Sequence, residues 1–160
     1  MLTHFQDNHP GSRAIDEDGN RLMEITDLQG RILERRVYTG EVLRKKTNFD
    51  AAGLPIRIEE YDEAGRLVLS READADSKEL NLTWRYDAEE TAVQAEKDRN
   101  GDGQADIWYF YKDGRIMRVE EDRNRDGKPD LWEAYDSTST LVRRDEDIDF
   151  DGAADIEKQF

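Results

Sequence analysis

Three nine-residue stretches combine carboxylates, side-chain amides and a glycine at the spacing that suits a hard metal ion. They read DRNGDGQAD, DRNRDGKPD and DIDFDGAAD and span residues 98–106, 122–130 and 147–155, so each fits the pattern Dx(N/D)xDGxxD. Calcium takes roughly six to eight oxygen ligands, and alternate residues of a tightly curled loop can aim their side chains at one centre. The pattern therefore predicts three Ca2+-binding loops, here called the first, second and third loops, with positions numbered 1 to 9.

Each position of the loop has an expected role. Side-chain oxygens at positions 1, 3 and 5 are the predicted ligands: Asp98, Asn100 and Asp102 in the first loop, Asp122, Asn124 and Asp126 in the second, and Asp147, Asp149 and Asp151 in the third. The carbonyls at position 7 are predicted backbone ligands, from Gln104, Lys128 and Ala153. The carboxylates at position 9 are expected to bind either directly or through water, and they belong to Asp106, Asp130 and Asp155. At position 6, where the loop must turn sharply, glycine avoids the strain of a Cβ.

The alternative is that Asp, Asn and Gly cluster because turns favour them, with the carboxylates simply solvated. Turn propensity does not require Asp again at position 9, and here it recurs in all three copies. Ten aspartates in these loops would repel one another without a cation. Three calcium ions would add six positive charges to a formal net charge of -15.

The loops resemble the first nine positions of EF-hand loops and, more closely, the DxDxDGxxD calcium loops of thrombospondin type 3 repeats and dockerins. An EF-hand ends with a bidentate Glu at position 12, where this chain has Tyr109, Glu133 and Lys158, so only the second loop could finish that way. Strands rather than helices are expected on both flanks, which argues against a true EF-hand. The resemblance implies millimolar calcium, and hence an extracellular, cell-surface or periplasmic location.

The loops belong to a repeat that runs through the chain. Six aromatic residues recur at spacings of 23, 25, 25, 24 and 25 residues, namely Tyr38, Tyr61, Tyr86, Tyr111, Tyr135 and Phe160. A constant period in this range indicates a repeat architecture. Between loops, residues 82–86, 107–111 and 131–135 are short, rich in aromatic and branched side chains and bounded by turn residues, as strands are. The sequence therefore predicts an all-β fold, an elongated antiparallel meander or solenoid-like array of β-hairpins.

Alternation along these strands predicts two different faces. Ile107, Tyr109 and Tyr111 share one face, which is the expected core. Trp108 and Phe110, with Trp132, fall on the other, which is either covered or exposes aromatics to a partner; burial is the expected outcome.

The turns have their own chemistry. Asp113-Gly114 predicts a two-residue type I′ hairpin turn. The segment 61–67, YDEAGRL, and the related segment 27–31, DLQGR, resemble the YD repeats of bacterial surface and secreted toxin proteins over about residues 25–120. Lys112 stands where the repeat would have Asp, so the pattern drifts within the chain.

The predicted organisation is a flexible polar leader at residues 1–13, degenerate hairpin repeats at 14–97 and calcium-binding hairpin repeats at 98–160, in one continuous array. Asn48, Asp50 and Gly53 are interpreted as a decayed metal loop with no ion. Two weaker copies are expected at Asp74 and Asp76, and at Asp16, Asp18 and Gly19.

Composition limits the possible functions. Only 36% of residues are hydrophobic and 39% are charged, so the core must be thin. The acidic balance disfavours nucleic acid and anionic membranes. No cysteine is present, no apolar run is long enough for membrane insertion, and residues 1–20 lack the sections of a signal peptide.

No enzyme motif appears, and His4 and His9 lie in the polar leader. The expected function is a non-enzymatic, structural or adhesive calcium-binding repeat protein. The alternatives are a module that binds a glycan or protein through exposed aromatics, and a fragment of a toxin-associated or carbohydrate-active protein. Self-assembly through open sheet edges is a further expectation.

Overall fold

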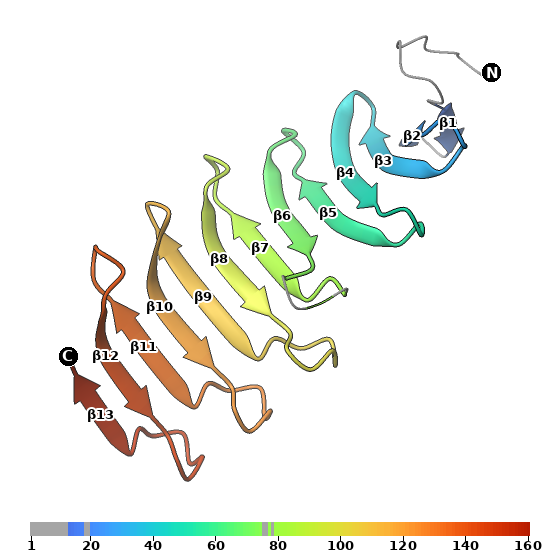
Figure 1. Ribbon diagram of the computed structural model, residues 1–160. Helices are drawn as coiled ribbons and strands as arrows, with labels where there is room; N and C mark the ends of the chain where they lie inside the picture. The colour runs from blue at the N-terminus through green and yellow to red at the C-terminus, as the bar shows by residue number, and fades with distance from the viewer. Residues whose placement is uncertain (1–12, 18–19, 75–76, 78) are drawn as a thin grey trace. The chain divides into compact units, whose positions relative to one another are not determined.

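The computed structural model describes residues 13–17, 20–74, 77 and 79–160, with the backbone alone for residues 13–17. The described residues form strands and turns and no helix. They divide into two compact units, an N-terminal unit Met1–Leu80 and a C-terminal unit Asn81–Phe160. Within each unit every strand pairs antiparallel with the next in sequence, which confirms the all-β hairpin meander (Figure 1).

The N-terminal unit contains six strands: β1 (Arg13–Glu17), β2 (Asn20–Thr26), β3 (Ile32–Thr39), β4 (Val42–Phe49), β5 (Pro55–Tyr61) and β6 (Leu67–Glu72). The C-terminal unit contains seven: β7 (Leu82–Tyr86), β8 (Ala92–Lys97), β9 (Ile107–Lys112), β10 (Arg115–Glu121), β11 (Leu131–Tyr135), β12 (Leu141–Glu146) and β13 (Ile156–Gln159). Arg13 is the first residue of β1, and the rest of the predicted leader lies outside the described residues.

The predicted core face is confirmed in the C-terminal unit. The register places Trp84, Ala95, Tyr109 and Val119 in one row across β7 to β10, so their side chains share a face. Ala95 and Val119 are buried. A second row on this face, next to the predicted metal loops, contains the buried side chains of Ile107 and Leu131.

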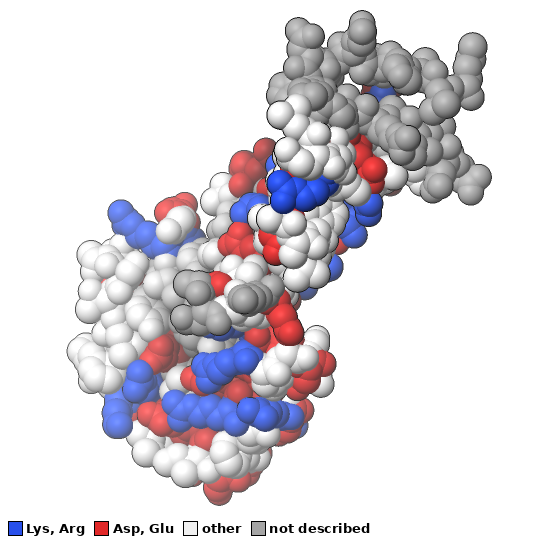
Figure 2. Space-filling model, turned by 45° about the vertical axis from the view of Figure 1, so that its right-hand side comes forward, with Lys and Arg blue, Asp and Glu red and all other residues white. Residues whose placement is uncertain are grey.

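The opposite face keeps its aromatics half-buried, so their predicted burial is incomplete. Trp108 and Trp132 flank Glu120 in the register, two strands apart. Arg118 lies 4.0 Å from the centre of the Phe110 ring, which gives that ring a cation–π contact. Figure 2 shows acidic and basic side chains interspersed on the visible surface rather than gathered into one-signed patches.

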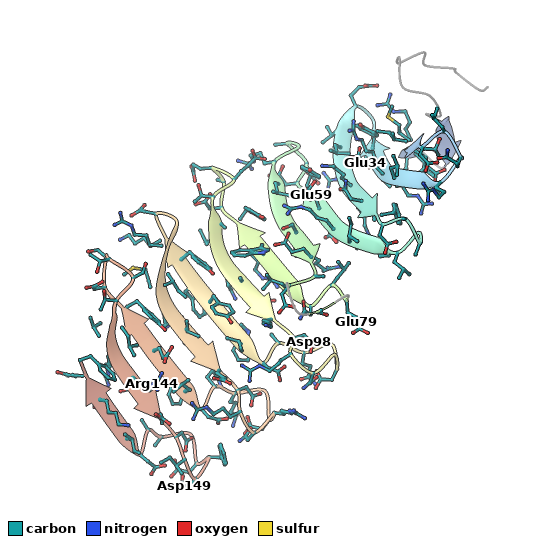
Figure 3. The ribbon with its side chains drawn as sticks, in the orientation of Figure 1. Glu34, Glu59, Glu79, Asp98, Arg144 and Asp149 are labelled. Carbon is teal, nitrogen blue, oxygen red and sulfur yellow. The ribbon has the colours of Figure 1, made fainter. Side chains whose placement is uncertain are left out.

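The two ends of the C-terminal meander carry different connections. At one end, short turns join β7 to β8, β9 to β10 and β11 to β12. At the other end, the three nine-residue loops join β8 to β9, β10 to β11 and β12 to β13 (Figure 1). Figure 3 shows Asp98 and Asp149 in separate loops, both at that end of the strands. The predicted type I′ turn is confirmed, because Asp113 and Gly114 have φ values of 51° and 71°.

Most other short turns begin with an Asp that organises its own backbone. In the turn from Asp62 to Arg66, one carboxylate oxygen of Asp62 accepts hydrogen bonds from the amides of Ala64 and Arg66, both at 2.9 Å. Gly65 takes a left-handed φ of 80°. The strand register shifts by one residue beside this turn, as in a hairpin closed by a bulge.

Asp50 occupies the same turn geometry as Asp62. Its carboxylate accepts hydrogen bonds from the amides of Ala52 at 2.8 Å and Leu54 at 2.9 Å, and Gly53 has a φ of 81°. The interpretation of this segment as a decayed metal loop is therefore wrong, because Asp50 opens a hairpin turn. Asp18, Gly19 and Asp76, which belong to the two weaker predicted copies, lie outside the described residues.

Candidate metal centre

Each of the three loops follows the same tightly curled backbone path. Position 6 is glycine with φ between 88° and 94°, at Gly103, Gly127 and Gly152. Position 4 also has a left-handed φ, and only the first loop has glycine there, Gly101; Arg125 and Phe150 have φ values of 66° and 63°. Non-glycine residues adopt this conformation at a cost of about 1 to 2 kcal/mol, so surrounding interactions must hold it.

The position 1 aspartate is the main organiser of that path. In the second loop, Asp122 accepts a hydrogen bond at Oδ1 from the Arg125 amide at 2.6 Å and one at Oδ2 from the Gly127 amide at 2.8 Å. Asp98 in the first loop and Asp147 in the third accept the equivalent pairs from positions 4 and 6. Both oxygens of each position 1 carboxylate therefore lie inside the curl.

Positions 3 and 5 continue the same arrangement. Each side-chain oxygen accepts a hydrogen bond from the amide two residues later, as Asn124 does from Asp126 at 2.8 Å and Asp126 does from Lys128 at 2.9 Å. The first and third loops repeat both bonds, so the position 7 residues Gln104 and Ala153 are held in the same way as Lys128. These bonds orient the second and third predicted ligands of every loop.

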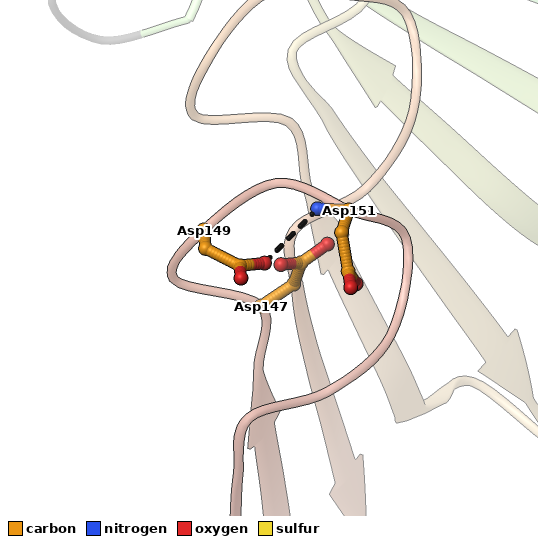
Figure 4. A group of neighbouring side chains, drawn as sticks. All are labelled: Asp147, Asp149 and Asp151. Atoms are coloured by element: carbon orange, nitrogen blue, oxygen red, sulfur yellow. Dashed lines mark hydrogen bonds between the residues drawn. The ribbon is translucent and has the colours of Figure 1, made fainter.

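The third loop has the most compact set of carboxylates. Asp147, Asp149 and Asp151 each offer an oxygen, and these oxygens lie within 4.8 Å of one another. Figure 4 shows the three side chains gathered within the loop, with the Asp151 amide bonded to Asp149 at 3.2 Å. Asp147 is buried while the other two are exposed, so the cluster opens to solvent on one side. A group of three carboxylates at this spacing can hold a metal ion.

The position 9 aspartates close the loop neck. Asp130 accepts hydrogen bonds from the amides of Arg123 at 2.8 Å and Asn124 at 3.1 Å, and it is 3% exposed. In the first loop both oxygens of Asp106 are used, one by the Arg99 amide at 2.6 Å and the other by the Asn100 side-chain amide at 3.3 Å. Asp155 is exposed but makes the corresponding bonds to the amides of positions 2 and 3. The structure therefore gives position 9 a capping role, which the sequence pattern alone did not reveal.

The residue after position 9 anchors each loop to the sheet. Ile107 and Leu131, which follow Asp106 and Asp130, are 6% and 5% exposed. The amide of Asp106 bonds to the carbonyl of Lys97 at 2.8 Å, so the strand pairing continues up to the loop neck. The third loop ends in the same way, with Ile156 after Asp155. An apolar side chain directly after the loop fixes the residue at which strand pairing resumes.

The comparisons with known proteins leave the family of the chain open. No family model and no curated protein matches it. A solved GtfA/B complex bound to UDP and GlcNAc is similar over 71% of this chain and 24% of that one, with 17% identity and a TM-score of 0.49. TarM from S. aureus is similar over 52% of this chain and 16% of that one, with 14% identity and a TM-score of 0.42. The chain thus spans less than a quarter of the length of these proteins.

A third similar structure, of accessory secretory protein 1, 2 and 3 in Streptococcus pneumoniae, covers 86% of this chain and 19% of that one, with 10% identity and a TM-score of 0.29. Among the described residues, no helix has the length and apolar character needed to cross a lipid bilayer.

Proposed function

We propose that the three loops bind Ca2+ and that the bound ions stabilise the hairpin repeats of a structural or adhesive, non-enzymatic protein. The observation that carries the proposal is the third loop, in which oxygens of Asp147, Asp149 and Asp151 lie within 4.8 Å of one another. Hard carboxylate oxygens in a flexible ring suit calcium better than a soft metal. The first and second loops support it, since they share the third loop's backbone and its hydrogen bonds.

Calcium has a clear structural task in this unit. The loops connect strands whose anchors, Ile107 and Leu131, are among the few buried apolar side chains. An ion that cross-links positions 1, 3 and 5 would hold the curl against carboxylate repulsion and so fix the strand ends. At a dissociation constant near 10⁻⁴ M, millimolar calcium would contribute about 1.4 kcal/mol per loop. Such an affinity suits a protein at the cell surface, in the periplasm or outside the cell.

Calorimetric titration of the full chain with CaCl2 tests the proposal. We expect about three ions per chain, and a variant carrying D102N, D126N and D151N should lose most of the heat of binding. These substitutions keep a side-chain oxygen for the amide at position 7 but remove one charge from each loop.

A matched control variant carries D62N, D87N and D136N. Each of these three aspartates opens a short hairpin turn and accepts a hydrogen bond from the amide four residues later. Because both variants replace three Asp by Asn, the control makes the same change in net charge. It should bind three ions like the unmodified chain. Calcium binding lost equally in both variants, or absent from the unmodified chain, would refute the proposal.

A second candidate function is a binding module for a glycan or protein on the opposite face. Trp108 and Trp132 are half-buried there on the same face of the sheet, two strands apart. Indole rings that remain partly exposed can stack on a sugar ring or pack into a partner. Replacing both with Ala tests this function. A folded variant that no longer binds an immobilised glycan panel would support it, and unchanged binding would exclude it.

A further inference from the structure

We propose that neighbouring loops are energetically coupled, so that an ion bound in one loop raises the calcium affinity of the next. The inference rests on the proposed calcium binding and adds a mechanism of regulation to the same sites. It follows from bonds that join one loop directly to another at their necks.

Backbone hydrogen bonds form the first link. The amide of Asp122, at position 1 of the second loop, donates to the carbonyl of Asp106, at position 9 of the first, at 2.8 Å. The amide of Asp147 donates to the carbonyl of Asp130 in the same way, also at 2.8 Å. Position 1 supplies the organising carboxylate and position 9 caps the neck. Ordering one loop therefore fixes the backbone that presents the first ligand of the next.

Ion pairs form the second link. Arg99, at position 2 of the first loop, lies 2.9 Å from Glu121, the residue just before the second loop. Arg123, at position 2 of the second loop, lies 3.1 Å from Glu146, the residue just before the third. Both pairs are partly exposed, so we expect them to contribute less than the backbone bonds. They identify Arg99 and Arg123 as positioning residues for the following loop.

Electrostatics between the ions acts in the opposite direction. Neighbouring loops are two strands apart, roughly 10 Å, and two divalent cations at that distance repel. At physiological ionic strength the Debye length of about 8 Å screens much of this repulsion. Ordering therefore dominates, and the net coupling is positive. Ordering of the neighbouring loop raises its calcium affinity and repulsion between the ions lowers it, so the sign of the measured coupling shows which of the two is larger.

The test is a calcium titration of the full chain followed by NMR of ¹⁵N-glycine. Gly103, Gly127 and Gly152 each have an amide bonded to the position 1 carboxylate of their own loop, so each reports one site. In D126N, which disables the second loop, the midpoint of the Gly152 signal should move to about fivefold higher calcium, at the low end of known coupling strengths. Electrostatic repulsion alone predicts a lower midpoint for Gly152. The empty second loop of D126N carries one positive charge less than the calcium-filled second loop of the unmodified chain, so it repels the ion in the third loop less.

Two single substitutions with the same charge change isolate the link. R123Q removes the ion pair to Glu146 and should shift the Gly152 midpoint about twofold. K112Q makes the same charge change at the turn end of β9, where Lys112 is exposed and forms no ion pair with the described residues, and should leave the midpoint unchanged. D102N, with Gly127 as the reporter, repeats the experiment on the first and second loops and serves if D126N does not fold.

The outcomes separate the two proposals. If Gly152 titrates in D126N at an unchanged or lower calcium concentration, the loops bind calcium independently and the coupling is refuted. If none of the three glycine signals of the unmodified chain responds to millimolar calcium, the proposed calcium binding itself fails. A midpoint raised in D126N and unaffected by K112Q supports the coupling.

Discussion

The two units share one repeat of antiparallel hairpins but bury different side chains. All the buried hydrophobic residues among those described lie in the C-terminal unit: Ala95, Ile107, Val119 and Leu131. In the described part of the N-terminal unit, the buried side chains are the polar ones of Thr47, Glu59 and Ser70. Glu59 and Ser70 are paired in the register, whereas Thr47 pairs with Ile58 on the other face. The same backbone repeat can therefore bury apolar side chains or polar ones.

The buried Glu59 of the N-terminal unit is held by ion pairs and hydrogen bonds. Glu59 lies 3.1 Å from Lys46 and 2.9 Å from Arg57, and it accepts a hydrogen bond from the Tyr61 hydroxyl at 2.9 Å. Burying a carboxylate is unfavourable unless such partners compensate. Glu133 holds the corresponding place in the C-terminal unit, with Tyr135 and Arg144 as its partners. Both units contain such charge pairs, and the C-terminal unit adds buried apolar side chains and the three nine-residue loops.

The largest expected difference between the units is their response to calcium. Saturation of three loops at about 1.4 kcal/mol each should raise the stability of the C-terminal unit by roughly 4 kcal/mol. The N-terminal unit should not respond. Hydrogen exchange followed by mass spectrometry, with calcium and with a chelator, should show slower exchange only in peptides from residues 81–160. Equal protection in both units would remove the contrast.

Loss of an organising carboxylate should be the next largest effect. D122A leaves the amides of Arg125 and Gly127 without their acceptor, and we expect a loss of about 2 to 4 kcal/mol. D62A removes an exposed turn cap and should destabilise its unit by about 1 kcal/mol.

Urea unfolding followed by tryptophan fluorescence can measure the effect of D122A, since Trp84, Trp108 and Trp132 all lie in the C-terminal unit. The effect of D62A has to be followed by the NMR signals of the glycine amides in the N-terminal unit. An effect of D62A as large as that of D122A would show that the loops resemble ordinary turns.

Much of this arrangement follows from the sequence. The repeat period, the strands, their two faces and the Asp113-Gly114 turn are set by local alternation and turn chemistry, so a pattern predicts them. Asp50 was misassigned because a metal-loop frame was imposed on a turn. The spacing distinguishes the two, since Asp precedes the turn glycine by three residues at Asp50 and by five at Asp98. Capping by position 9 depends on how each loop closes on itself, and the bonds between loops and the burial of Glu59 depend on the register between strands; neither is contained in a local pattern.

Acid should weaken the N-terminal unit through Glu59. Burial alone would raise the pKa of this carboxyl, but hydrogen bonds from Lys46, Tyr61 and Arg57 together lower it below the usual value. Its contribution to stability is therefore complete above the unfolded pKa of about 4.3 and is lost as the pH falls through the lowered folded pKa. Urea unfolding between pH 6 and pH 3, monitored on the Gly53 and Gly65 amides, should show a steeper loss for the unmodified chain than for E59Q. Identical slopes would contradict the assigned role of Glu59.

The smallest expected effect concerns the corresponding pair in the C-terminal unit. Burial and the hydrogen bond to Glu133 raise the pKa of Tyr135 to about 12. The neutral phenol is thus favoured in the folded state. Its contribution to the free energy of unfolding is complete below pH 10 and is lost as the pH rises toward 12. Burial also raises the pKa of Tyr111. Absorbance titration at 295 nm should therefore show a late-titrating component that shrinks in Y135F and titrates earlier in E133Q. A normal titration of every tyrosine would refute the pairing.

The most direct measurement of the central claim is anomalous scattering from crystals grown in calcium. Three peaks should appear, each enclosed by the position 1, 3 and 5 side chains of one loop and none in the short turns of either unit. Well-ordered loops without peaks, with Asp147, Asp149 and Asp151 bonded only to water and to their own backbone, would contradict the account.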